Sequence, residues 1–241
     1  MRILAFDTST VVASVAVADG KKTLAEVSGP AETKHGDTLL STIQTALERA
    51  NITLAQTDLI AVGIGPGSFT GVRVGLATAK GLALATGKPL IGVVSLRALA
   101  RGTAQTEGLI APMVDAYRNE VYSALYQLDG ADRLTEKLPP LNQTPEKTAE
   151  RLRLAAEGSP ILLCGNGARR YGRQLVELAG KSARLADPAY DAPRAAALAQ
   201  EARLAFEQEG PSDLSALEPL YLRPSDAQLP RRLIGPTKVP D

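Results

Sequence analysis

The chain carries one short pattern twice, and this repeat constrains its fold more than any other feature. In each copy an apolar, strand-like segment ends in an aspartate, a polar turn follows, a second apolar segment returns, and an Asp-Gly pair closes the unit. The first copy runs from Arg2 to Gly20 and the second from Leu109 to Gly130. An internal repeat of this kind predicts two lobes of similar topology.

Around these two copies, apolar runs alternate with helical patterns, which is typical of an α/β fold. Because each copy opens with an antiparallel hairpin, we expect both sheets to be mixed. Apolar runs predict further strands at 23–28, 59–64, 90–94 and 160–164. Periodicity and capping signals predict helices at 37–50, 95–104, 145–157, 171–179 and 193–209, and one that begins within the segment 65–73 and ends near residue 86.

The repeat also divides the chain. We expect an N-terminal lobe over residues 1–106, a C-terminal lobe over 107–225, and a loose tail over 226–241. The last thirty residues are rich in proline, which predicts that they wrap the surface or stay loose.

Composition excludes several classes of protein. The 241 residues include 44% hydrophobic residues, and 27 basic residues against 26 acidic ones give a net charge of +1. This balance gives no overall electrostatic signal for nucleic acid or a membrane surface. The sequence lacks a transmembrane run of about 18 apolar residues and the features of a signal peptide, so we expect a cytoplasmic protein. Cys164 is the single cysteine and lies in an apolar run, which predicts a buried thiol and no disulfide.

The glycine-rich segment Gly65–Arg73 is the first candidate for chemistry, as a phosphate loop before a helix. A nucleoside triphosphate loop needs lysine and then Ser or Thr after its last glycine, but Val72 and Arg73 follow Gly71 here. A dinucleotide fingerprint needs glycine in sixth place, where this segment has Thr70. The spacing therefore argues against phosphate binding.

A serine nucleophile fits no better. A nucleophile elbow needs glycines two residues before and after the serine, but Pro66 and Thr70 flank Ser68 at those positions. The single histidine, His35, lies in a charged loop, and we expect a solvated side chain rather than a catalytic base. One histidine and one cysteine also argue against a zinc site.

Close packing explains the segment better. Small residues recur every four positions along the helix that follows, at Gly71, Gly75, Ala79, Ala83 and Gly87. Glycine inside a helix costs about 1 kcal/mol relative to alanine, so a close neighbour is expected as compensation. That neighbour is either an element of the same lobe or a partner subunit, and we expect a partner.

We predict that such an interface is formed by this helix and the helix at 37–50. The predicted contact residues are Leu39, Leu40, Ile43, Leu47, Phe69, Val72, Gly75, Leu76, Ala79 and Lys80. A bulky change such as Gly75→Leu would then disrupt dimerisation and leave the lobe folded.

The two aspartates at the strand ends, Asp7 and Asp115, are the remaining candidates. Paired hairpins of this kind hold nucleotide phosphates in actin-like ATPases, where glycine two residues after the aspartate lets the backbone approach phosphate. Ser9 and Tyr117 occupy those positions here. We therefore expect both aspartates to cap their own turns.

Four segments together resemble one known family over roughly residues 1–225. They are Ile3–Ser9, Gly65–Arg73, Asp115–Tyr122 and Pro219–Arg223, in that order. They are similar to the TsaB (YeaZ) family of bacterial tRNA threonylcarbamoyladenosine (t6A) biosynthesis proteins. The resemblance implies an actin-like two-lobed fold (ASKHA, ribonuclease-H-like) with mixed sheets. It also implies a non-catalytic paralogue of TsaD, the subunit that transfers threonylcarbamoyl to N6 of adenosine 37 in ANN-decoding tRNAs.

The same resemblance implies partners. TsaB proteins pair with TsaD through helices of the first lobe and form a similar homodimer alone. TsaE joins the assembly, TsaC makes the threonylcarbamoyl-adenylate, and tRNA is engaged through the complex. The resemblance implies no cofactor or metal on the isolated chain, and it leaves open a nucleotide at the interface with partners. No membrane role is implied.

One alternative stays open. The same fold would suit a kinase-like ATP-binding enzyme or a glycoprotease-type peptidase. Binding of ATP or cleavage of peptides by the isolated chain, lost on Asp7→Ala, would distinguish such an enzyme from an accessory subunit.

Overall fold

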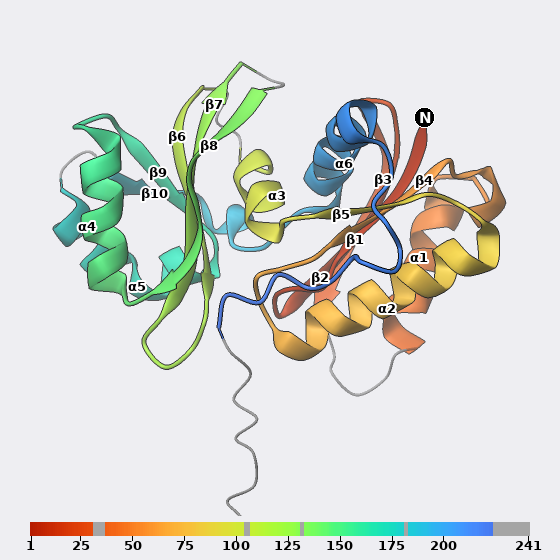
Figure 1. The fold of residues 1–241 in the computed structure, drawn as a ribbon, viewed down its shortest axis with the longest axis horizontal. Helices are drawn as coiled ribbons and strands as arrows, with labels where there is room; N and C mark the ends of the chain where they lie inside the picture. Colours follow the sequence, from red (N-terminus) through yellow and green to blue (C-terminus); the bar gives the residue numbers. More distant parts are fainter. Residues whose placement is uncertain (31–36, 104–106, 131–132, 181–182, 224–241) are drawn as a thin grey trace, which may run out of the picture.

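The computed structural model describes residues 1–30, 37–103, 107–130, 133–180 and 183–223. It contains two lobes, each built on a five-stranded mixed sheet (Figure 1). The first sheet has the order β3-β2-β1-β4-β5 and comprises β1 (Arg2–Asp7), β2 (Val12–Asp19), β3 (Lys22–Pro30), β4 (Leu59–Gly63) and β5 (Leu90–Val93). The second has the order β10-β9-β6-β7-β8 and comprises β6 (Glu107–Asp115), β7 (Val121–Asp129), β8 (Arg133–Gln143), β9 (Ile161–Cys164) and β10 (Ala183–Leu185).

Both lobes follow one topology, as the repeat predicts. In each, three antiparallel strands are followed by two parallel ones, and a helix follows each of the last three strands. The helices are α1 (Asp37–Arg49), α2 (Phe69–Thr86), α3 (Ser95–Arg101), α4 (Pro145–Ala156), α5 (Asn166–Ala179) and α6 (Ala195–Glu209), with short 3-10 turns at Leu54–Gln56 and Pro188–Tyr190. The α/β class, the mixed sheets and the two-lobed arrangement are confirmed.

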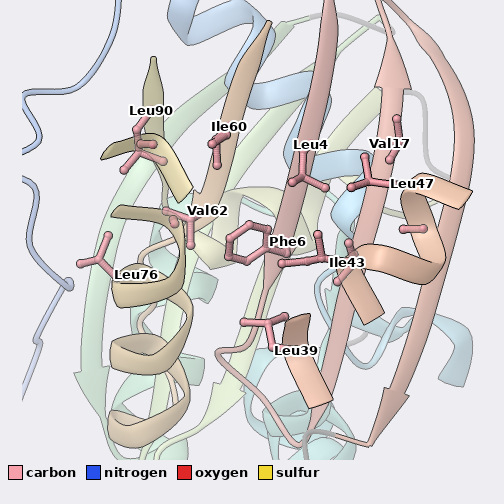
Figure 2. Packing of buried hydrophobic residues seen from close by; sticks show 14 residues of the cluster. Leu4, Phe6, Val17, Leu39, Ile43, Leu47, Ile60, Val62, Leu76 and Leu90 are labelled. Atoms are coloured by element: carbon pink, nitrogen blue, oxygen red, sulfur yellow. The ribbon is translucent and has the colours of Figure 1, made fainter. Parts of the chain in front are cut away.

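Alternation along β1 divides the first lobe into two hydrophobic layers. Leu4 and Phe6 point toward α1 and α2, while Ile3 and Ala5 point toward α6. This is the period of two that a strand buried on both faces requires. Figure 2 shows Phe6 at the centre of the first layer, beside Ile43 of α1.

The third helix of each lobe packs on the sheet of the other lobe. Leu96 and Leu99 of α3 are buried with strands of the second sheet, and Leu198 of α6 is buried with strands of the first (Figure 1). Between these helices, the buried Glu201 of α6 forms ion pairs with Arg97 and Arg101 of α3. Each lobe therefore contributes one helix to the core of the other. The lobe boundary at 106/107 stays a prediction.

Three elements differ from the sequence expectations. β8 was not predicted because it contains Pro139 and Pro140, which an edge strand tolerates and a central strand does not. The short edge strand β10 was also not predicted. α5 begins at Asn166 rather than near residue 171, because Asn166-Gly167 has the composition of a turn. The tail predicted over 226–241 lies outside the described residues.

Candidate functional site

Asp7, at the end of β1, is a buried carboxyl group surrounded by donors of its own chain. It accepts hydrogen bonds from the backbone N–H (2.8 Å) and hydroxyl (2.6 Å) of Ser9 and from the Ser95 hydroxyl (2.6 Å). A Cβ at Gly63 would lie 1.9 Å from its Oδ2, so only glycine fits there. Burial raises the pKa of Asp7, and the three hydrogen bonds oppose that shift. Asp7 therefore caps its turn, as expected.

The segment before α2 covers this first turn. The N–H of Ser68 donates to the carbonyl oxygen of Ser9 (2.7 Å), and the Thr8 hydroxyl donates to the carbonyl oxygen of Gly71 (2.7 Å). A Cβ at Gly67 would lie 2.1 Å from the Ser9 carbonyl oxygen, and one at Gly71 would lie 2.1 Å from that of Thr8. The glycines let the segment lie directly on the backbone of the turn.

The same contact continues one helical turn further. A Cβ at Gly75 would lie 2.3 Å from the Thr8 hydroxyl oxygen. The close neighbour of Gly71 and Gly75 is therefore the β1–β2 turn of the same chain, and the expectation of a partner subunit is wrong at these two positions. Gly75→Leu would disturb the fold itself, so it cannot serve as a probe of an interface.

Three backbone donors of the Gly65–Arg73 segment are already bonded within the chain. The N–H of Gly65 donates to the Ser95 hydroxyl (3.1 Å), that of Ser68 to Ser9, and that of Gly71 to the Ser68 hydroxyl (3.2 Å). Such donors bind phosphate only when they point into open space. This geometry agrees with the glycine spacing in arguing against a phosphate loop.

The second turn keeps the aspartate cap but stays open. Asp115 accepts from the N–H of Tyr117 (3.0 Å) and from Nη1 of Arg170 on α5 (2.7 Å). Asn166 accepts from the N–H of Asp115 (3.0 Å) and so joins α5 to the end of β6. Tyr117 is 58% exposed. Both aspartates cap their turns. In the first turn Thr8, Ser9 and Thr10 are buried and only Val11 is exposed, whereas Tyr117, Arg118 and Asn119 of the second turn are all exposed.

Residues 210–223, which we call the C-terminal strap, connect the two lobes. The strap runs beside the first sheet, where the N–H groups of Ser212 and Leu220 donate to the carbonyl oxygens of Leu90 (2.9 Å) and Ile64 (2.8 Å). In Figure 1 this segment crosses from α6 past α2 toward the second lobe. The described part of the proline-rich C-terminal region therefore wraps the surface.

The end of the strap contacts both the Gly65–Arg73 segment and the Asp115–Tyr122 segment. Tyr221 lies 5.4 Å from Phe69 between ring centroids, and its hydroxyl accepts from Nε of Arg73 (2.6 Å). Arg223 donates to the Ala116 carbonyl oxygen (3.1 Å) and pairs with Glu120. Three of the four segments that carry the family resemblance thus meet at one edge of the molecule.

The predicted interface residues fall into two groups. Three are not buried: Leu40 is 50% exposed, Phe69 is 45% exposed, and Lys80 is half-buried. The other seven are packed inside the chain's own first lobe: Leu39, Ile43, Leu47, Val72, Gly75, Leu76 and Ala79. In this conformation those seven offer a partner no surface, so any contact must come from the other side of the helices.

The outward side of α2 is apolar, and the sequence prediction missed it. Leu84 is 76% exposed and Val74 39%, and Ala77, Gly81 and Ala85 lie exposed among them. A Cβ at Gly81 would meet nothing within 4 Å. We call these five residues the α2 outer face. The signal lay in the sequence, since they are apolar positions on the side opposite the small-residue stripe.

The remaining candidate residues give no reactive site within the described ranges. Cys164 is buried, and burial raises the pKa of its thiol, as expected for an inert cysteine. His35 lies outside the described residues. Within the described ranges, no three His, Cys, Asp or Glu side chains gather as metal ligands would, and no helix has the length and hydropathy to cross a bilayer.

Comparison with known proteins identifies the family. The family model of TsaD, described as tRNA N6-adenosine threonylcarbamoyltransferase, matches residues 27–163. The tRNA threonylcarbamoyladenosine biosynthesis protein TsaB of Bacillus subtilis strain 168 is 30% identical over 228 residues, which cover 95% of this chain and 96% of that protein. The chain belongs to the TsaB family. Escherichia coli K12 TsaB is 41% identical over 132 residues, covering 54% of this chain and 56% of that protein.

Solved structures agree with membership of the TsaB family. YeaZ from Pseudomonas aeruginosa superposes with a TM-score of 0.79 at 28% identity, over 92% of this chain and 99% of that one. The ROK hexokinase of Thermus thermophilus superposes with a TM-score of 0.52 at 15% identity, over 86% of this chain and 99% of that one. That second likeness shows the actin-like fold alone.

Proposed function

We propose that this chain is a non-catalytic subunit in t6A biosynthesis that binds TsaD through the α2 outer face. In this role it supports the transfer of threonylcarbamoyl to N6 of adenosine 37 of ANN-decoding tRNAs, and catalysis resides in TsaD. Two observations support the proposal. The α2 outer face is exposed and uncharged, and residues 64–68 of the same chain cover the β1–β2 turn, where related folds bind phosphate.

The α2 outer face has the chemistry of a protein interface. Leu84 and Val74 are large and exposed, and burying one such side chain contributes about 1.5–3 kcal/mol. Gly81 costs the helix about 1 kcal/mol relative to alanine, and among the residues that the structure describes no atom lies within 4 Å of a Cβ built there. A partner helix approaching closely at Gly81 would account for that cost.

One end of the face carries a more polar anchor. Arg73 lies over the ring of Phe69, with its guanidinium carbon 3.7 Å from the ring centroid, and Tyr221 holds it from the strap. Exposed aromatic and arginine side chains that are already ordered are typical of interface hot spots. Leu40 of the neighbouring α1 would extend the same surface.

The proposal extends to the wider assembly. The same face would pair two copies of the chain when TsaD is absent, and TsaE and tRNA would join through the complex. A nucleotide would bind only at an interface shared with partners. The setting would be the cytoplasm, where tRNA is modified.

The test uses Leu84→Asp, with Leu154→Asp as its matched control. Leu154 is 62% exposed on α4 of the second lobe, far from the α2 outer face in the fold. We expect Leu84→Asp to weaken TsaD binding by about 10- to 100-fold, since burying this exposed leucine in the complex would contribute about 1.5–3 kcal/mol. The control should bind normally. Equal affinity of both variants in calorimetry would refute this surface.

An assay of t6A formation distinguishes an accessory subunit from an enzyme. t6A formation on a tRNA transcript should require this chain together with TsaD, and it should fall with Leu84→Asp but not with Leu154→Asp. The alternative, a kinase-like or peptidase enzyme, predicts turnover by the isolated chain, and such turnover would overturn the proposal.

A further inference from the structure

The β6–β7 turn adopts an unusual conformation that presents side chains outward. Tyr117, Arg118 and Asn119 have φ values of 58°, 51° and 59°. The left-handed region costs roughly 1 kcal/mol or more for each residue with a side chain, so the surrounding bonds must hold the turn. The N–H of Ala116 donates to the Glu120 carbonyl oxygen (3.0 Å), and the N–H of Glu120 donates to that of Tyr117 (3.0 Å).

Cations from α5 lie beside this turn. Arg170 donates to Asp115 and still has 54% of its side chain exposed. Its guanidinium carbon lies 5.5 Å from the ring centroid of Tyr171. Arg173, three residues after Arg170 on α5, is also exposed. We call Tyr117, Arg118, Arg170, Tyr171 and Arg173 the second-lobe basic surface.

The charge of this surface differs from that of the whole chain. The protein as a whole is nearly neutral, with a net charge of +1. Here Arg170 pairs with Asp115, Arg223 pairs with Glu120, and Arg118 also lies near Glu120. With the exposed Arg173, four arginines accompany these two carboxylates. The local excess of positive charge, beside an aromatic ring that is 58% exposed, is the combination that binds the backbone and bases of single-stranded RNA.

We propose that the second-lobe basic surface binds tRNA directly. The arginines would contact phosphates, and Tyr117 would stack on an unpaired base. This inference rests on the proposed function, because tRNA is the molecule that the complex modifies. An acidic protein could use the same charges and the same ring, and the competition experiment below distinguishes it from RNA.

The position of the surface suits this role. Tyr221 contacts the first turn of α2, and Arg223, two residues later, contacts the β6–β7 turn. Two residues of extended chain span about 7 Å, so the strap places the basic surface beside the anchor of the α2 outer face. RNA bound here would lie next to a TsaD subunit docked on α2.

The experiment measures anisotropy of a labelled, unmodified tRNA transcript with an ANN anticodon, titrated with the complex of the full chain and TsaD. Arg170→Gln/Arg173→Gln should weaken binding about tenfold and lower the slope of log K against log salt by about 1 to 2, as expected for two lost phosphate contacts. Tyr117→Ala should weaken it by roughly 5- to 150-fold without changing the slope.

The matched control is Lys22→Gln/Arg133→Gln, which removes two exposed charges far from the β6–β7 turn. Unchanged affinity and slope in Arg170→Gln/Arg173→Gln, relative to this control, would overturn the inference. Competition by polyglutamate as strong as by RNA of equal charge would overturn it too and point to an acidic protein.

Binding of each variant to TsaD, measured separately by calorimetry, keeps the two proposals distinct. Normal TsaD binding with weakened tRNA binding supports the inference. If wild-type chain fails to bind TsaD, the proposed function fails, and the same titrations on the full chain alone decide the RNA surface.

Discussion

The two lobes contain the same aspartate-capped turn, but most of the first turn is buried and most of the second is exposed. Thr8 and Ser9 are 5% and 1% exposed, whereas Tyr117 is 58% exposed. The difference arises from the connection that follows the next parallel strand. Five residues, 64–68, separate β4 from α2 and fold over the first turn, whereas only Gly165 separates β9 from α5.

This comparison shows how one repeat can serve two purposes. In the second lobe, Gly165 and Gly167 pack under the backbone of Met113 and Val114 rather than over the turn. The β6–β7 turn is therefore free to present side chains. In the first lobe the same topology instead buries the turn and leaves the opposite side of α2 exposed.

The largest expected effect comes from the ion cluster that joins the lobes. Glu201→Ala leaves Arg101 buried without its carboxylate, which should cost about 3–5 kcal/mol of unfolding free energy. Glu207→Ala on the same helix removes a carboxylate that is 53% exposed from its pair with Arg203, and it should cost less than about 0.5 kcal/mol. Urea unfolding of both variants measures the contrast, and similar values would show that the exchanged helices are not a rigid junction.

Two glycines of α2 should respond in opposite directions. Gly71→Ala drives a methyl group into the Thr8 carbonyl and should destabilise the chain by about 1–3 kcal/mol. Gly81→Ala enters open space and should stabilise it by up to about 1 kcal/mol. Thermal unfolding tests the pair, and a stabilising Gly71→Ala would contradict the covered first turn.

Asp7 of the first turn and Glu120 at the end of the second should make the free energy of unfolding depend on pH in opposite directions. Burial raises the pKa of Asp7 above its ordinary value of 3.8. The folded state therefore holds the proton more tightly than the unfolded state, and stability falls as pH rises from 3.8 through the folded pKa. Asp7→Asn should remove that fall, as a pH series of urea unfolding would show.

Glu120 provides the opposite case. Hydrogen bonds from Arg223 and Asn142 lower the pKa of Glu120 below its ordinary value of 4.5. Its stabilisation is therefore complete above pH 4.5 and is lost as pH falls through the folded pKa. The difference between wild type and Glu120→Gln should shrink in acid. A difference that grows in acid would exclude the strap contact as its source.

The sequence predicted the fold well because its signals are local. Apolar runs, the repeated aspartates and the helix caps depend on neighbouring residues, and the elements they predict are present. β8 was not predicted from the sequence because Pro139 and Pro140 are acceptable only at a sheet edge, and edge position is a property of the folded sheet.

The site was predicted less well because periodicity does not say which side of a helix is buried. The stripe through Gly71 and Gly75 had the small residues of a close contact, but the contact is with Thr8, 63 positions away from Gly71. Both sides of α2 are apolar in the sequence, and only the fold, with β1 and β4 beneath α2, shows that the side with Gly81 and Leu84 is the exposed one. The strap contacts of Tyr221 and Arg223 likewise depend on the assembled lobes.

The central claim is that residues 64–68 cover the β1–β2 turn, so that this turn binds no nucleotide, and that the protein acts by binding partners on its surface. Calorimetric titration of the isolated full chain with Mg-ATP tests this claim most directly. We predict no saturable heat, because the N–H groups of Gly65, Ser68 and Gly71 are already bonded within the chain. Saturable binding that disappears in a folded Asp7→Asn variant would contradict the account.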